Sequence, residues 1–141
     1  MVNLLLATLL VACGGGKDDT GSAGDDAVSG GGGDPSVAPE VLSVERAECT
    51  QQQSAGEVWD VQLTVDDPQG AGTVRGGTFD VLNAAGGELA SEQALACGNG
   101  QCFGSLRAAT SGVTCAAEIV FRFVVTDTDG NASDAFEHTP G

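Results

Sequence analysis

Apolar and polar residues alternate along much of the chain after residue 40, with the two-residue period that is typical of β-strands. In segment 58–65 the inward positions are expected to be Trp59, Val61, Leu63 and Val65. Segment 119–126 shows the same alternation and carries valine on its second face as well, which predicts a central strand. We expect this later segment to form the middle of the hydrophobic core.

Five further segments complete a predicted set of seven short strands. They cover residues 41–45, 77–83, 86–92, 101–109 and 132–138. In the first of them, Val41, Ser43 and Glu45 are expected to face opposite Leu42 and Val44. Gly, Pro and Asp turns separate the strands, and no segment shows the apolar repeat of an amphipathic helix. This pattern predicts an all-β sandwich of one domain, with a barrel as the alternative.

The first twelve residues form an apolar segment of another kind. Its apolar run, from Leu4 to Ala12, is about nine residues long, whereas a transmembrane helix needs about 20. A short apolar run that ends on a small residue predicts a secretory signal peptide over residues 1–12. The alternatives are a buried strand, or a plain signal peptide in which Cys13 has no role.

The residues Leu10, Val11, Ala12 and Cys13 resemble the lipobox of bacterial lipoproteins. The resemblance implies cleavage before Cys13, a diacylglyceryl group on its sulfur and attachment to a membrane of the cell envelope. Acyl chains hold a protein at a bilayer because each buried methylene contributes about 0.8 kcal/mol. The residue after Cys13 is Gly14 and not an aspartate. By the same resemblance this implies sorting to the outer membrane if the host is Gram-negative.

Residues 13–39 are rich in Gly, Asp, Ser and Ala and include four consecutive glycines at 30–33. This composition buries too little apolar surface to offset an ordering entropy of about 1–2 kcal/mol per residue. It predicts a disordered linker after the lipidated cysteine, with solvated acidic residues. The folded domain is therefore expected to cover residues 40–138.

Two turn sequences of this domain resemble those of bacterial immunoglobulin-like domains. They are Asp66-Asp67-Pro68-Gln69-Gly70 and Val125-Thr126-Asp127-Thr128-Asp129-Gly130-Asn131-Ala132-Ser133. The resemblance implies an immunoglobulin-like β-sandwich with hairpin turns at both places, because Gly and Asn accept positive φ and Asp side chains bond nearby amides. Trp59 falls on the second predicted strand, whereas antibody domains carry their buried Trp on the third.

The chain contains five cysteines, and setting Cys13 aside leaves four that can form two disulfides in an exported protein. Of the three possible connectivities we favour Cys97 with Cys102 across a tight loop, and Cys49 with Cys115 between the first strand and the start of the sixth. The alternative is a zinc site on Cys97, Cys102, Cys115 and His138. An oxidising compartment would remove those thiols, so disulfides are the preferred interpretation.

Catalytic chemistry finds little support in the sequence. His138 is the single histidine and lies near the chain end, where a general base is hard to hold in place. Twenty acidic residues make chance carboxylate pairs inevitable, so such pairs do not by themselves indicate a glycosidase.

A net charge of −15 argues against nucleic acid and anionic lipid headgroups as partners. Exposed aromatic residues could stack on sugars, and Phe103 and Phe136 are the two phenylalanines expected outside the core.

The loop Asp127-Thr128-Asp129-Gly130-Asn131 has some likeness to a calcium loop but lacks the glycine and glutamate spacing of an EF-hand. We predict an ordinary hairpin turn here, and the alternative is a weak calcium site that Asp127 and Asp129 share with Asp66 or Asp67. Taken together, the sequence predicts a lipid-anchored envelope protein with a non-catalytic binding or structural module. Its partner would be an envelope protein or a glycan. The alternatives are a calcium-stiffened adhesion spacer, and a hydrolase or inhibitor that uses loop carboxylates.

Overall fold

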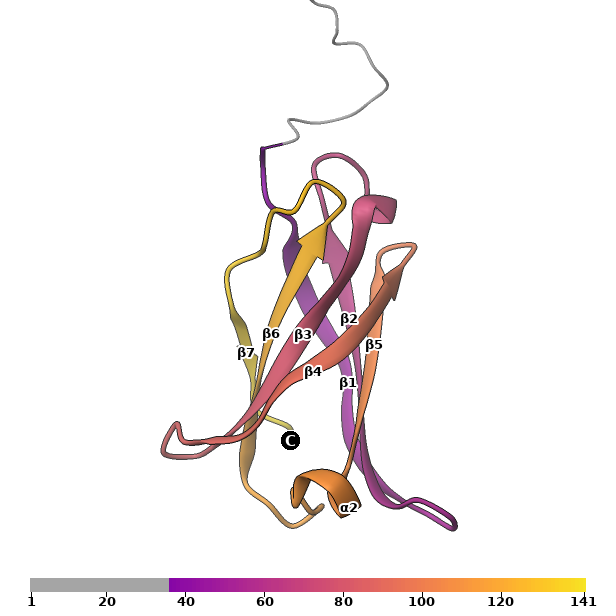
Figure 1. The fold of residues 1–141 in the computed structure, drawn as a ribbon, viewed down its shortest axis with the longest axis vertical. Helices are drawn as coiled ribbons and strands as arrows, with labels where there is room; N and C mark the ends of the chain where they lie inside the picture. The colour runs from indigo at the N-terminus through magenta and orange to yellow at the C-terminus, as the bar shows by residue number, and fades with distance from the viewer. Residues whose placement is uncertain (1–35) are drawn as a thin grey trace, which may run out of the picture. The chain divides into compact units, whose positions relative to one another are not determined.

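The computed structural model describes residues 36–141. The signal peptide, Cys13 and most of the predicted linker lie outside these residues. Within them the chain forms an all-β fold of seven antiparallel strands (Figure 1): β1 (Glu40–Gln52), β2 (Gly56–Asp66), β3 (Val74–Asn83), β4 (Glu88–Gly98), β5 (Gln101–Arg107), β6 (Ile119–Asp127) and β7 (Phe136–His138). Two short helical segments, η3 (Ala71–Thr73) and α2 (Ala108–Ser111), join strands. No helix in the described part of the chain is long and apolar enough to cross a membrane.

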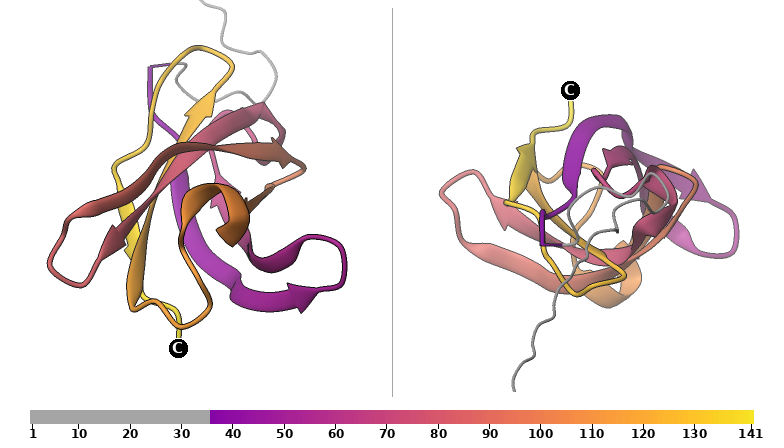
Figure 2. Two further views of the ribbon diagram at one scale, coloured as in Figure 1. Left: turned by 60° about the horizontal axis from the view of Figure 1, so that its bottom comes forward. Right: turned by 90° about the horizontal axis from the view of Figure 1, so that it is seen from above.

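The strands follow the order β1-β2-β5-β4-β3-β6-β7 in one continuous sheet, with β1 and β7 at its edges. The sheet curls around a common interior, as the views in Figure 2 show. Immunoglobulin sandwiches have the strand neighbours A-B-E-D and C-F-G, and the seven strands of this sheet have the same neighbours in that order. Here β4 pairs with β3 along most of its length and with β5 over three residue pairs only. The predicted all-β, sandwich-like fold is therefore confirmed.

The core lies between strands that are not neighbours in the sheet. The alternation predicted for β2 is confirmed, because Trp59, Val61, Leu63 and Val65 are all buried. On β6 the residues Ile119, Phe121, Phe123 and Val125 are buried in the same way, and Val120 and Val124 on the other face are half-buried. Four aromatic rings meet at the centre. The centroid of Phe121 lies 5.5 Å from that of Trp59, 5.9 Å from that of Phe79 and 5.8 Å from that of Phe123.

The predicted alternation in β1 is wrong after its first residue. Two irregularities interrupt the pairing of β1 with β2, one between Val41 and Ser43 and one between Val44 and Arg46. Each inserts an extra residue and so exchanges the inward and outward faces of the strand. Val41 is buried, and Val44, Ala47 and Cys49 pack against the core, while Leu42 is 50% exposed. The bulges also disturb the long free edge of β1, which would otherwise be open to pairing with another strand.

Several strand bounds differ from the prediction. The fourth strand continues past Glu92 to Gly98. Glu92 adopts a left-handed conformation (φ 52°), which interrupts the alternation, and the inward pattern resumes at Leu95 within the same strand. The fifth strand ends at Arg107, where α2 begins. The last strand is short because the side chain of Ser133 bonds to the backbone N–H of Val125, in place of continuous backbone pairing. Pro39, expected in the linker, is buried, so the folded part begins slightly earlier than predicted.

One glycine allows two strands to approach closely. A Cβ atom on Gly77 of β3 would lie 2.2 Å from the carbonyl oxygen of Val124 on β6 and 2.8 Å from the Cα of Val125. Both contacts are with backbone atoms, so a side chain at this position would push the central strands apart. The absence of a side chain at Gly77 is therefore part of what lets β3 and β6 pair under the aromatic cluster.

Candidate functional site

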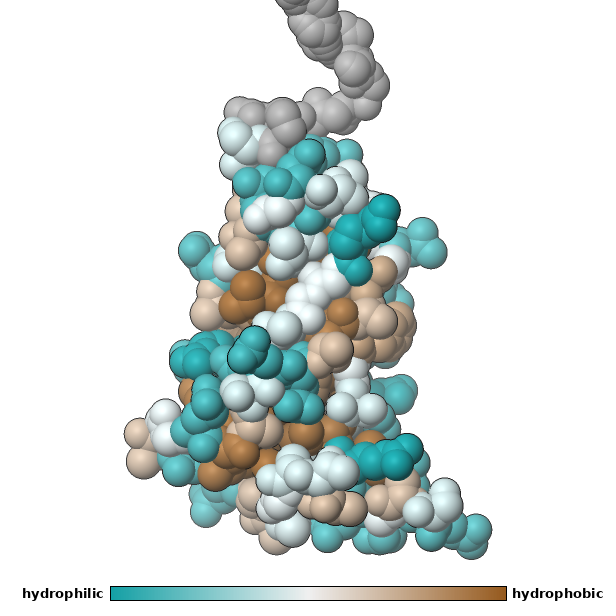
Figure 3. All heavy atoms as spheres, viewed as in Figure 1, coloured by the Kyte–Doolittle hydropathy of each residue, from teal (hydrophilic) through white to brown (hydrophobic). Residues whose placement is uncertain are grey.

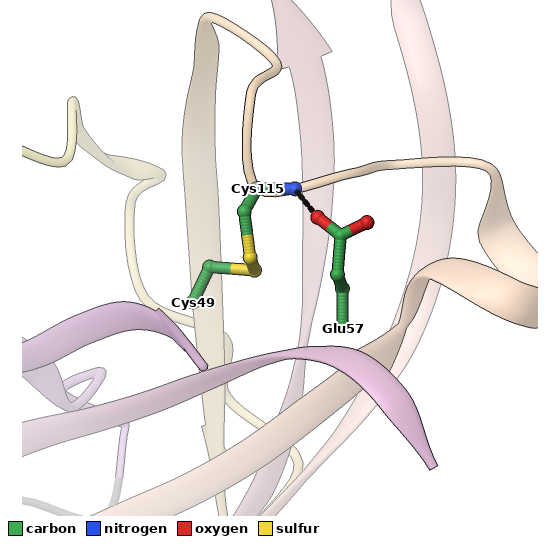
Figure 4. A group of neighbouring side chains, drawn as sticks. All are labelled: Cys49, Glu57 and Cys115. Carbon is green, nitrogen blue, oxygen red and sulfur yellow. Dashed lines mark hydrogen bonds between the residues drawn. A yellow bond between two sulfur atoms is a disulfide. The ribbon is translucent and has the colours of Figure 1, made fainter. Parts of the chain in front are cut away.

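The disulfide between Cys49 and Cys115 joins the end of β1 to the loop that precedes β6, as predicted. Its Cα atoms are 5.3 Å apart, and the two cysteines are 66 positions apart in sequence. The side chain of Glu57 accepts a hydrogen bond from the backbone N–H of Cys115 (2.6 Å), and Figure 4 shows its carboxylate beside the bridge. Trp59 faces Cys49 in the strand register and donates its indole N–H to the carbonyl of Thr114 (3.3 Å). The disulfide and two hydrogen bonds thus fix the loop before β6.

The second predicted disulfide, Cys97 with Cys102, is also present. The two cysteines face each other across the β4–β5 hairpin, with Cα atoms 4.0 Å apart. Asn99 and Gly100 form the two-residue turn, and both have positive φ (54° and 81°), as a type I′ hairpin requires. Because β4 and β5 share only three residue pairs, this bridge holds together the one place where the two strands meet.

Three potential metal-ligating groups come together in the described part of the chain: Cys49, Glu57 and Cys115 have ligand atoms within 4.8 Å of one another. Both sulfurs belong to the disulfide, however, and only a thiolate is a good metal ligand. The carboxylate of Glu57 acts as an acceptor for the Cys115 amide. The alternative zinc site on Cys97, Cys102, Cys115 and His138 is wrong for the same reason, because all three of its cysteines form disulfides.

The four predicted calcium ligands occupy two turns, and the structure does not assemble them into a site. Asp66 and Asp129 are exposed, whereas Asp67 and Asp127 are 2% and 4% exposed. Among residues 36–141, no three of these carboxylates have oxygens within 4.8 Å of one another. One oxygen stands out: Oδ1 of Asp67 accepts the N–H of Gln69 (2.9 Å), while the buried Oδ2 has no hydrogen-bond partner within this part of the protein.

Asp127 organises the loop between β6 and β7. Its Oδ1 accepts the backbone N–H groups of Asp129 (2.9 Å) and Asn131 (2.8 Å), and its Oδ2 accepts the side-chain amide of Asn131 (2.9 Å). Burial alone would raise the pKa of Asp127. The hydrogen bonds from Asn131 and Asp129, and one from the side chain of Gln69, lower it by more, so its pKa lies below the ordinary value of 3.8. The predicted hairpin turn is thus built on this carboxylate, and Gln69 links it to the β2–β3 turn.

A charged pair that the sequence analysis missed lies on the outer face of β3 and β6. Arg122 donates to Oδ2 of Asp80 (2.9 Å), and the backbone N–H of Glu92 donates to Oδ1 (2.9 Å). The hydrogen bond from Glu92 is the main cause that lowers the pKa of Asp80, and Arg122 adds to it against the opposing effect of burial. Both aspartates with a shifted pKa are thus held ionised, whereas a carboxyl group that acts as a general acid needs a raised pKa.

The two phenylalanines expected outside the core have different positions. Phe103 on β5 is 49% exposed, which agrees with the expectation. Phe136 on β7 is half-buried and packs against the core, so its expected exposure is wrong. His138 pairs with Phe121 at the edge of the sheet and has no hydroxyl nucleophile bonded to it within residues 36–141.

Comparisons of the sequence and of the structure with protein families, curated proteins and solved structures find no match.

The long disulfide should contribute more stability than the short one. In the chain-entropy model a closed loop of about 67 residues contributes roughly 4 kcal/mol and one of about six residues roughly 2 kcal/mol. We expect the Cys49→Ala/Cys115→Ala variant to lose about twice the free energy of unfolding lost by the Cys97→Ala/Cys102→Ala variant, measured by urea unfolding. Equal losses, or a larger loss from the hairpin variant, would contradict this ranking.

The carboxylate of Asp127 should make stability depend on pH in a defined window. Because its pKa is lowered in the folded state, its contribution is present above the ordinary value of 3.8 and disappears as the pH falls through the folded value. We expect Asp127→Asn to flatten the fall in unfolding free energy between about pH 5 and pH 2, measured by urea unfolding. Asp134→Asn, at an exposed position of the same loop, is the control. Parallel curves for wild type and Asp127→Asn would refute the assignment.

Proposed function

We propose that this chain is a lipid-anchored protein of the cell envelope whose folded domain is a non-catalytic binding or structural module of the bacterial immunoglobulin-like type. The single observation that carries this proposal is the cysteine pairing. All four cysteines of the domain are used in two disulfides, which persist in an oxidising compartment outside the cytosol. Cys13 is the one cysteine of the chain that remains, and it follows Leu10, Val11 and Ala12 at the end of a short apolar run.

The arrangement of the domain is compatible with a binding role on a rigid support. Tight turns join β1 to β2, β3 to β4 and β4 to β5. Both acidic groups with a shifted pKa in the described domain serve local structure. Function in such modules resides on exposed faces and loops that a stable sheet holds in place. In an outer-membrane setting, the domain would be displayed from the membrane by the linker that follows Cys13.

A calcium-stiffened spacer is the second candidate, and Asp67 favours it. A buried carboxylate oxygen without a partner is costly, and a bound cation would supply the missing interaction. We expect added calcium to raise the melting temperature, since a site saturated a hundredfold adds about 2.7 kcal/mol to stability. Asp67→Asn should abolish the shift and Asp134→Asn should keep it. No shift with wild type would retire this candidate.

Lipidation is tested by the intact mass of the full chain extracted from the membranes of an expressing bacterium, without reduction. We expect a species that begins at Cys13, carries a diacylglyceryl group and is four hydrogens lighter than the fully reduced chain. A Cys13→Ser variant should remain uncleaved and lack the lipid, while keeping both disulfides. An unlipidated mass for the wild-type chain, or free thiols in the domain, would overturn the proposed anchor.

A further inference from the structure

An open hollow of about 660 Å³ lies on the outer face of β2, β5 and β4, with Phe103 as its one aromatic wall. It is a shallow and open depression, so a ligand would lie across the outer face of the sheet and stay partly exposed to solvent. The hollow exists because β4 and β5 separate after three pairs, the last of which joins Ala96 to Phe103. Phe103 directly follows Cys102, which is fully buried and bonded to Cys97, so the backbone that carries the exposed ring is held in place.

Polar groups without internal partners lie beside this ring. Asp60 on β2 and Ser105 on β5 face each other in the strand register and both line the hollow. Neither side chain has a hydrogen-bond partner within residues 36–141, so both can receive a ligand. The carboxylate can only accept hydrogen bonds, whereas the hydroxyl can donate and accept. The opposite wall offers Ala94 and Ala96, which leave room, and Gln93. The Nε2 of Gln93 donates to the carbonyl of Ser91 (2.7 Å), so its Oε1 is the atom that can receive a ligand.

A sugar ring matches this combination of groups. A pyranose presents a face of C–H groups that can stack on an aromatic ring and a rim of hydroxyls that both donate and accept. An acetamido group adds a methyl that small residues can accommodate and an N–H that can donate to Oε1 of Gln93. The net charge of −15 disfavours an acidic sugar, and it also disfavours a second copy of the chain.

The face that Figure 3 shows gives less support to a protein partner. On the face shown in Figure 3, brown areas over β3, β4 and β6 are small and are interrupted by teal and white. A stable protein interface needs a buried centre with several large anchors. Phe103 is the only aromatic residue among the large hydrophobic residues that the described part of the chain exposes.

We propose that this hollow binds an uncharged glycan that contains N-acetylhexosamine, with Phe103 as the stacking platform and Asp60 and Ser105 as hydrogen-bonding groups to the sugar hydroxyls. This assignment rests on the proposed function as a binding module, for which it names the ligand class. The site is carried by strands and a disulfide, so it is formed before the ligand arrives, which lowers the ordering cost of binding.

The test is an NMR titration of the full chain, oxidised and held in a detergent free of sugar, with chitotetraose, four β-1,4-linked N-acetylglucosamine units. We expect saturable shifts of the backbone amides at Asp60, Ala94 and Phe103 and their strand neighbours. Phe103→Ala should weaken binding roughly tenfold or more, as loss of a central contact does. Phe103→Trp should retain binding. Leu89→Ala removes a similarly exposed side chain (42%) on β4 outside the hollow and should bind like wild type.

Two results would overturn the site: no saturable shifts at roughly 10 mM chitotetraose, or equal affinity for wild type and Phe103→Ala. The amide spectrum of each variant shows directly whether the domain is folded, so a loss of binding cannot be confused with unfolding. The titration does not depend on the anchor. If it fails while the mass shows lipidation at Cys13, only the ligand is wrong, and if lipidation fails, a positive titration still stands.

Discussion

The packing of Phe121 against Trp59 is the contact on which the rest of the fold depends. The two residues lie on β6 and β2, which are separated by three strands in the order of the sheet and share no backbone hydrogen bonds. Only side-chain packing can hold these strands face to face, and burial of large aromatic rings is the strongest such contribution per residue. The sheet closes over its interior at this contact, with Phe79 and Phe123 completing the cluster.

The disulfides and the tight backbone contacts reinforce that closure at different places. Cys49 pairs with Trp59 across β1 and β2, and its bridge reaches Cys115 just before β6, so a covalent bond spans the same two halves that the aromatic contact joins. The second disulfide, between Cys97 and Cys102, joins β4 to β5 within the three residue pairs that these strands share. Because those strands separate beyond it, their outer face is left with a hollow instead of a continuous ladder. The proposed binding site therefore lies where the pairing of β4 with β5 ends, beside the disulfide that joins the two strands.

The sequence predicted the features that depend on the local residue pattern. It missed those that depend on which strands become neighbours and in which register. The two-residue period identified β2 and β6 and their inward faces. The even cysteine count predicted two disulfides, and the tight loop between Cys97 and Cys102 favoured the pairing that is present. The inward face of β1 could not be predicted, because its bulges arise from its register with β2. In the same way, Asp80 and Arg122 lie on outward positions of segments predicted as strands, but nothing local indicates that these strands are neighbours. The hollow at Phe103 depends on where two strands part, which no residue pattern encodes.

A double-mutant cycle on Trp59→Leu and Phe121→Leu measures most directly whether the contact between β2 and β6 holds the domain together. Each single variant and the double variant would be unfolded with urea, and the coupling free energy taken from the four unfolding free energies. We predict that the double variant loses less than the sum of the singles, with a coupling of about 0.5–1.5 kcal/mol, as found for packed aromatic pairs. Fully additive losses would contradict the central role given to this contact.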